Sequence, residues 1–206
     1  MDSMHDELLP LFPLSAVLLP QNPLPLHIFE DRYKEMIGRV LREGGEFGVV
    51  LAAGQGILPA GCTATVQEVT KEYPDGRLDI VTIGHRRFTI RSVDQELGYA
   101  RGDVEYFDDE EPGASPALRE QAAAACRPLI EEGLDLDEPQ LSYLLARPVT
   151  DPLFRQQLLM LRSERERLER LIAYVPGYLA AQKQAEARRE TAGKNGHGKL
   201  PPGLIH

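Results

Sequence analysis

The feature that most constrains this chain is an acidic run, Asp108 to Glu111, followed at once by Pro112 and Gly113. Like charges in succession repel one another, and a Pro-Gly pair interrupts regular structure, so residues 108–115 are predicted to form a solvated linker. Short apolar and β-branched runs precede the linker, whereas apolar residues at helical spacing follow it. The chain is therefore predicted to have an α+β fold, with its strands first and most of its helices last.

Residues 1–107 are predicted to form a β-barrel subdomain. Strands are expected at residues 47–51, 62–73, 78–83, 87–93 and 99–106. The sequence Pro74-Asp75-Gly76 is typical of a tight turn between two of them, and Gly84 is expected to end the strand that begins at Leu78. So many short strands in antiparallel succession predict a closed or nearly closed barrel.

One helix is predicted inside this barrel subdomain, beginning just after Phe29. Acidic residues occupy its first turn, basic residues lie near its end, and Gly44 and Gly45 follow as a stop signal. Its apolar face recurs at the spacing of an α-helix and consists of Tyr33, Met36, Ile37, Val40 and Leu41.

Residues 116–184 are predicted to form a helical subdomain. Ser115 and Asp151 each precede a proline and are predicted as N-caps, with Asp137 as a third candidate cap. Apolar residues at helical spacing between Phe154 and Val175 predict one long amphipathic helix. Residues 185–206 are rich in glycine and lysine and are predicted to form a flexible basic tail.

The net charge of the 206-residue chain is -9. The segment from Lys183 onward carries five basic and two acidic residues, so the remainder is more acidic still. Such a surface repels nucleic acid, because phosphate-binding surfaces collect lysine and arginine. The basic cluster of the predicted barrel consists of Arg86, Arg87 and Arg91, which Arg77 can join across the sheet.

The two cysteines, Cys62 and Cys126, form no disulfide framework. The first residues are polar and acidic, unlike a signal peptide, and no apolar stretch approaches the ~20 residues needed to span a bilayer. These observations predict a cytoplasmic protein that does not enter a membrane.

The first 33 residues also contain an extended motif, in which Leu9-Pro10-Leu11-Phe12-Pro13-Leu14 leads to Pro25-Leu26-His27-Ile28-Phe29-Glu30-Asp31-Arg32-Tyr33. Phe47-Gly48-Val49-Val50, the turn Pro74-Asp75-Gly76-Arg77 and the strand Gly84-His85-Arg86-Arg87-Phe88 follow in order. Together these segments resemble the N-terminal, substrate-binding domain of the Lon ATP-dependent proteases, over nearly the whole chain before the tail.

The resemblance implies a PUA-like β-barrel with one inserted helix, followed by a C-terminal helical bundle. In full-length Lon proteases this region helps to recognise substrates and to assemble the ring, and it contains neither the ATPase nor the protease site. The chain looks like a stand-alone bacterial copy of that domain. The implied partners are polypeptide clients or a separate protease or chaperone machine, and a monomer or weak dimer is expected.

The residues of the motif are read mainly as structural. Prolines cannot donate to a sheet ladder, so they are expected at strand ends, edges or bulges. Phe29 is expected to pack against the first turns of the following helix, and Glu30 is expected to pair with Arg32. The residues assigned to this structural motif are Pro25, His27, Phe29, Glu30, Arg32, Tyr33, Asp75, Gly76, Arg77, Gly84, Arg87 and Phe88.

No catalytic machinery is predicted. The sequence contains neither a Gly-x-x-x-x-Gly-Lys-Ser/Thr phosphate loop nor a Gly-x-Ser-x-Gly nucleophile elbow. Cys62 and Cys126 lack CxxC partners, and His27 and Glu30 are not expected on a helix, so no metal site is predicted either. The chain is accordingly predicted to be a non-enzyme without a cofactor.

Three functions remain in competition. The first is a protein-binding adaptor that recognises unfolded or tagged polypeptide, partly by edge pairing, with contacts from Leu24, Phe29, Tyr33 and Tyr73. The second is RNA binding, which PUA-like barrels often perform and which the acidic charge opposes. The third is a small-molecule site in the cleft between barrel and helices.

Overall fold

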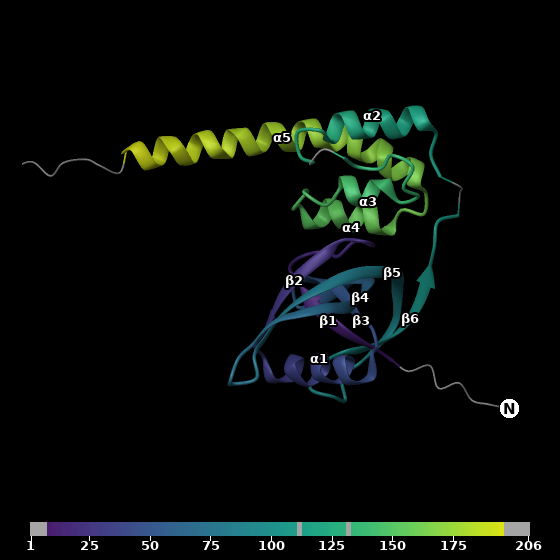
Figure 1. The fold of residues 1–206 in the computed structure, drawn as a ribbon, viewed down its shortest axis with the longest axis vertical. Coiled ribbons are helices and arrows are strands. Elements are labelled where there is room, and N and C mark those ends of the chain that lie inside the picture. Colours follow the sequence, from purple (N-terminus) through teal and green to yellow (C-terminus); the bar gives the residue numbers. More distant parts are fainter. Residues whose placement is uncertain (1–7, 111–112, 131–132, 196–206) are drawn as a thin grey trace, which may run out of the picture.

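The computed structural model describes residues 8–110, 113–130 and 133–195, with side chains in the last helix up to residue 189 (Figure 1). Helices α2 to α5 form a separate layer above the barrel, and β6 leads up to it. This order confirms the α+β class, the barrel with one inserted helix and the helical C-terminal part. The elements are β1 (Leu9–Leu14), β2 (Pro23–Ile28), α1 (Asp31–Glu43), β3 (Phe47–Ala53), β4 (Gly56–Glu72), β5 (Leu78–Asp94), β6 (Arg101–Phe107), α2 (Pro116–Cys126), α3 (Leu141–Leu145), α4 (Pro152–Met160) and α5 (Glu164–Asn195).

The sheet closes on itself through its last strand. β6 pairs with both β1 and β5, so that β1, β3, β4, β5 and β6 form a ring. β2 stands outside this ring and pairs with the first part of β5. The predicted closed barrel is therefore present. One pairing differs from the predicted antiparallel succession, because β1 and β3 are parallel and the intervening β2 and α1 supply the crossover that this requires.

Helix α1 packs against the barrel through the face that its sequence predicts. Tyr33, Met36, Ile37 and Val40 are buried and share a core with barrel residues, whereas Leu41 is largely exposed. The helix ends at Gly44, which has a φ of 68° and donates its N–H to the carbonyl of Val40.

Gly84 does not interrupt its strand, contrary to prediction. β5 runs unbroken from Leu78 to Asp94, and Gly84 lies where the segment before β2 crosses it. A Cβ atom at this position would stand 2.3 Å from the carbonyl oxygen of Leu19. The Gly84 N–H donates to the Asn22 carbonyl at 3.1 Å, and its own carbonyl accepts from the Gln21 N–H at 2.8 Å. The glycine is thus required because two chain segments approach each other closely here, and not because the strand ends.

The long helix predicted from Phe154 to Val175 is two helices, α4 and α5. The chain leaves α4 at Leu161 in an extended conformation, with φ -67° and ψ 134°. The Leu161 carbonyl then accepts hydrogen bonds from Arg87 Nη1 at 2.5 Å and Arg167 Nη1 at 2.9 Å. These tertiary contacts satisfy a carbonyl that a continuous helix would have used, so the break is stable.

The ends of the other helices match the prediction in part. Ser115 and Asp151 cap α2 and α4 through side-chain hydrogen bonds, as expected. Asp137 caps no helix, because α3 begins later, after Gln140. Helix α5 continues to Asn195 and extends well past the other helices (Figure 1), so residues 185–195 of the predicted flexible tail are helical. The rest of that tail lies outside the described residues.

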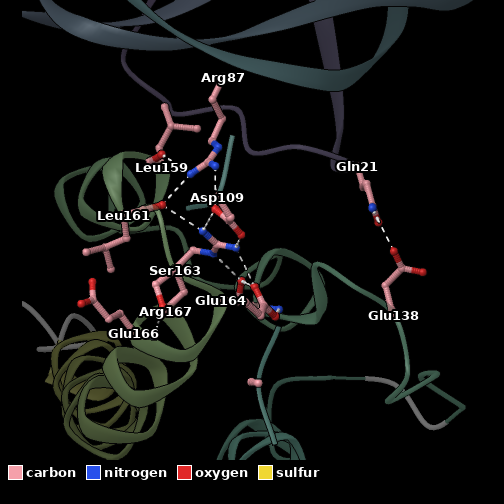
Figure 2. A network of polar contacts seen from close by, with 12 residues as sticks. Gln21, Arg87, Asp109, Glu138, Leu159, Leu161, Ser163, Glu164, Glu166 and Arg167 are labelled. Atoms are coloured by element: carbon pink, nitrogen blue, oxygen red, sulfur yellow. Dashed lines mark hydrogen bonds and ion pairs between the residues drawn. The ribbon is translucent and has the colours of Figure 1, made fainter. Parts of the chain in front are cut away.

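A buried charge network joins the barrel to the helical layer (Figure 2). Asp109 Oδ1 accepts from Arg87 Nη2 of β5 at 2.6 Å and from Arg167 Nη1 of α5 at 2.7 Å. The Arg87 and Arg167 side chains are only 2% and 0% exposed. Asp109 belongs to the stretch predicted as a solvated linker, so that prediction was wrong for this residue.

Helix α3 enters the same network through Ser142. Arg167 Nε donates to Ser142 Oγ at 2.8 Å, and Arg167 Nη2 donates to Glu164 Oε2 at 2.8 Å. Glu164 in turn accepts from the Ser142 N–H at 2.8 Å and from its hydroxyl at 2.6 Å. Two guanidinium groups thus face two carboxylates, and burial costs less because the charges balance and the hydrogen bonds are made.

Replacing Asp109 by Asn is expected to destabilise the fold by about 3 kcal/mol or more, because it removes a negative charge that balances two buried guanidinium groups. Urea unfolding followed by circular dichroism measures the change. The matched control is Glu169→Gln, which removes the exposed 3.6 Å pair with Arg165 and is expected to cost under about 0.5 kcal/mol. Equal effects of the two substitutions would contradict the assigned role of Asp109.

Replacing Gly84 by Ala is expected to destabilise the fold by roughly 2 kcal/mol or more, because the new methyl group meets backbone that cannot move aside easily. The control is Gly45→Ala, where an added Cβ meets nothing within 4 Å. Thermal unfolding of both variants compares them. If the Gly84→Ala variant is as stable as Gly45→Ala, the backbone around Leu19 can move aside at little cost, and the assigned role of Gly84 is wrong.

Candidate functional site

A groove with a volume of about 860 Å³ opens on the barrel. Three connections meet there, namely the segment between β2 and α1, the turn between β3 and β4, and the loop between β5 and β6. β1 also reaches it through Phe12, Pro13 and Leu14. Segments far apart in the sequence therefore build one surface, and barrel closure places them together.

The most exposed apolar side chains of the groove are Phe29 and Val93. Their exposed fractions are 59% and 44%, which is high for residues of this size. Tyr33 and Tyr99 also line the groove and are almost fully buried. The Tyr33 ring stands edge-on to Phe12, with ring centroids 4.3 Å apart. The groove thus exposes apolar side chains at Phe29 and Val93 among polar groups, on a firmly packed base.

The charged groups at the groove pair with one another. Glu30 Oε2 lies 2.7 Å from Arg32 Nη2, which confirms the predicted ion pair. The Arg32 guanidinium also lies over the Tyr33 ring, 4.6 Å from its centroid. Because this charge pair is internally balanced, the groove does not select strongly for a charged ligand.

A hydrogen-bonded cluster holds His27 at the rim. His27 Nδ1 lies 2.5 Å from Asp79 Oδ1, and the Tyr73 hydroxyl donates to Asp79 Oδ2 at 2.8 Å. The hydrogen bond with His27, followed by that with Tyr73, holds the pKa of Asp79 below its usual value. The His27 ring stacks on Phe29 with centroids 5.9 Å apart. Asp79 thus accepts hydrogen bonds from both rings and fixes their orientation.

Two of the four predicted contact residues lie in the groove. Phe29 and Tyr33 line it, and Phe29 is exposed and stacked on His27, whereas it was expected to pack on the helix. Leu24 packs against the hydrophobic core from β2 and does not line the groove. Tyr73 lies beside the rim, with Lys71 and Arg77 over its ring at 4.5 and 4.7 Å from the centroid.

The other motif residues occupy different parts of the barrel. Pro25 and His27 line the groove, and Gly84, Arg87 and Phe88 lie in β5. At the turn between β4 and β5, Gly76 has a φ of 81° and Asp75 accepts from the Arg77 N–H at 3.2 Å. Half of the motif residues thus line the groove, and the other half lie in β5 or in the turn before it.

Sequence reasoning missed the wall supplied by the loop between β5 and β6. Leu97 and Tyr99 line the groove from this loop, together with Val93 from the end of β5. The available signal was an apolar residue on each side of Gly98, just where the last strand was predicted to begin. That signal marks a loop that contacts something, but not the partner it contacts.

The junction between barrel and helices is filled by direct contacts. Gln156 Nε2 of α4 donates to the Ala60 carbonyl at 3.0 Å, and Arg155 Nε donates to the Val17 carbonyl at 2.9 Å. Burial lowers the pKa of Arg155 to about 10. These contacts disfavour the predicted alternative of a small-molecule cleft at this junction.

The basic cluster that suggested RNA binding is paired with carboxylates. Arg87 is buried in the junction, and the other members face acidic neighbours. A phosphate would have to compete with each of these internal partners, which disfavours phosphate binding. The pairs are Arg77 with Asp75 at 2.7 Å, Arg86 with Glu46 at 3.0 Å, Arg87 with Asp109 at 2.6 Å and Arg91 with Glu105 at 3.2 Å.

Within the described ranges, no group of three or more His, Cys, Asp or Glu side chains is placed to hold a metal ion. In the same part of the chain, no helix has the length and apolar character needed to cross a membrane.

Comparison with known proteins adds two kinds of likeness. Residues 8–176 match the family model described as the ATP-dependent protease La (LON) substrate-binding domain. The fold is similar to a crystal structure of a Lon N-terminal domain protein from Xanthomonas campestris, with 29% identity, a TM-score of 0.68, and coverage of 81% of this chain and 97% of that one. The N-terminal domain of a Mycobacterium avium complex Lon protease shares the fold at 17% identity and a TM-score of 0.61, with coverage of 82% and 98%.

Both cysteines are expected to resist chemical modification in the folded protein. Burial raises the pKa of the Cys62 thiol to about 12 and that of Cys126 to about 11, so little thiolate forms at a pH of about 8. A water-soluble aromatic disulfide reagent is expected to react at least tenfold more slowly in native buffer than in denaturant. Equal rates in the two conditions would show that one of the thiols is accessible.

Proposed function

Because the chain belongs to the Lon (ATP-dependent protease La) substrate-binding domain family, we propose that it binds polypeptide segments in its barrel groove and does not cleave them. The observation that carries this proposal is the groove itself, where Phe29 and Val93 expose apolar surface. Removing apolar surface of this kind from water lowers the free energy, so a ligand that covers it is bound more tightly.

The size of the groove suits a short stretch of chain. A volume of about 860 Å³ accommodates a few side chains and not a folded domain. Burying an exposed aromatic or aliphatic side chain contributes roughly 1.5–3 kcal/mol before ordering costs, so a few such contacts support only moderate affinity. Moderate, side-chain-driven binding suits the recognition of segments exposed in unfolded or tagged proteins.

We propose further that the protein acts as an adaptor or regulator of proteolysis. In that role it delivers clients to, or withholds them from, a separate protease or chaperone machine. The rigid attachment of the helical layer through Asp109 supports this role, because a fixed second layer offers a partner a surface away from the groove. A reducing, cytoplasmic location is consistent with two buried free thiols.

The alternative of RNA binding is weaker on physical grounds. Arg77, Arg86, Arg87 and Arg91 are all engaged by carboxylates, and the chain as a whole carries a charge of -9. An RNA ligand would need to displace these partners against long-range repulsion.

Replacing Phe29 by Ser is expected to weaken the binding of a labelled, permanently unfolded polypeptide by roughly fivefold to twentyfold. Fluorescence anisotropy measures the affinity, and near-ultraviolet circular dichroism checks that the fold is retained. The reason is that the change removes the largest exposed apolar group of the groove while leaving its floor intact.

The matched control is Leu153→Ser, which removes a leucine that is 64% exposed on α4, away from the groove. Its affinity should equal that of the unmodified protein. An equal loss of affinity in both variants would mean that binding is nonspecific and hydrophobic. No binding by the unmodified protein would refute the proposed function.

A further inference from the structure

We propose that the groove recognises its polypeptide through side chains, in an extended polyproline-like conformation, and not by adding the client as an extra strand along β2 or β1. The ligand class that fits is an apolar segment that contains prolines. This inference rests on the proposed function and deepens it, because it names how the groove recognises a client. It also departs from the edge pairing suggested by the sequence.

The first argument concerns the outer strand, β2. Pro25 of β2 pairs with Val81 of β5. Proline has no N–H, so this position cannot be one of the mutually hydrogen-bonded pairs of an antiparallel ladder. Backbone groups alternate in direction along a strand, so Leu24 and Leu26 point their N–H groups toward β5, whereas Pro23, Pro25 and His27 face the open edge.

The open edge of β2 is therefore poor in donors. Two of the three outward positions are prolines and offer only a carbonyl oxygen, which leaves the N–H of His27 as the outward donor within the strand. An added strand must both donate to and accept from its neighbour at each hydrogen-bonded pair. β2 cannot donate at its two outward prolines, so an added strand would lack half of its hydrogen bonds there. Prolines on the edges of other sheets prevent strand addition in the same way.

The second argument concerns β1, whose end lines the groove. β1 pairs with β6 at Leu9 and Pro10, and the Leu11 N–H then donates to the Ala100 carbonyl at 2.8 Å. Beyond that point the two strands part, and the groove opens between them. The backbone N–H of Leu11 points toward β6, so the same alternation turns the backbone nitrogen of Pro13 to that side. Pro13 has no N–H, so this position offers no donor.

β2 and the parted end of β1 both reach the groove, and both place proline where a donor would be needed. The start of β4, residues 56–59, and the end of β5, residues 90–94, also have a strand neighbour on one side only. Along β2 and β1, a client that depends on strand pairing gains little, whereas a client that lacks N–H groups loses little.

The lining of the groove matches such a client. His27 stacks beside Phe29, which is largely exposed, so aromatic surface at the rim is available to prolyl rings, whereas Tyr33 and Tyr99 are almost fully buried. Aromatic-lined grooves bind polyproline-type segments because these are already extended and lose little conformational entropy. The paired charges of Glu30 and Arg32 favour an uncharged centre in the segment.

The test uses the full chain and three labelled ten-residue peptides of matched apolar composition. The parent lacks proline, the second carries proline at alternate positions, and the third is the parent with alternate backbone nitrogens methylated. We expect the second and third peptides to bind within about threefold of the parent, or more tightly. A loss of tenfold or more for both, with the parent still bound, would overturn this inference and leave the proposed function intact.

If none of the three peptides binds, and unfolded polypeptide does not bind either, the proposed function fails together with this inference. If unfolded polypeptide binds and none of the peptides does, the inference alone fails.

A Pro25→Val variant examines the cause directly, because it returns one outward N–H to β2. In this variant the parent peptide is expected to bind at least threefold more tightly than its methylated form, since strand pairing becomes possible. If the variant discriminates no more than the unmodified protein, the edge prolines are not what prevents strand addition. Circular dichroism establishes that the variant is folded.

Discussion

The architecture depends on one carboxylate, Asp109, which lies between two buried guanidinium groups (Figure 2). Arg87 reaches it from the barrel and Arg167 from the helices, so a residue just after the last barrel strand attaches the layer above. The same two arginines bind the Leu161 carbonyl and thereby stabilise the break between α4 and α5. One polar cluster thus fixes the orientation of the layers and the course of the chain through the upper one. Buried charge of this kind demands near-complete pairing, which makes the arrangement specific.

Local patterns in the sequence predicted the elements whose causes are local. Helix α1 follows from its apolar spacing and its glycine stop, and the caps at Ser115 and Asp151 were recognisable from the following prolines. The break between α4 and α5 was missed because its cause, Arg87, lies in a strand far away in the sequence. Gly84 was wrongly predicted to end its strand for a similar reason. The small residue is needed because the backbone of Leu19 lies against it, and not because of β5 itself.

The candidate site shows the same division. Phe29 and Tyr33 were identifiable because they belong to the extended motif after the proline-rich segment. Val93 and Tyr99 were not, because barrel closure alone carries the loop between β5 and β6 to the opposite wall. Leu24 and Tyr73 looked equivalent to Phe29 in the sequence, yet β2 directs Leu24 into the core and the β4–β5 hairpin places Tyr73 beside the rim. Which face a side chain occupies is a property of the assembled sheet.

The short contact between β1 and β6 has a consequence for the mechanics of the barrel. The ring is completed there by Leu9 opposite Gly102 and Pro10 opposite Arg101, supported by the hydrogen bond from Leu11. This join has fewer paired residues than any other in the ring, and the residues next to it, Phe12 and Ala100, line the groove. Separating β1 from β6 would therefore disrupt less regular structure than separating any other two neighbouring strands of the ring, whereas the β4–β5 hairpin shares the most paired positions.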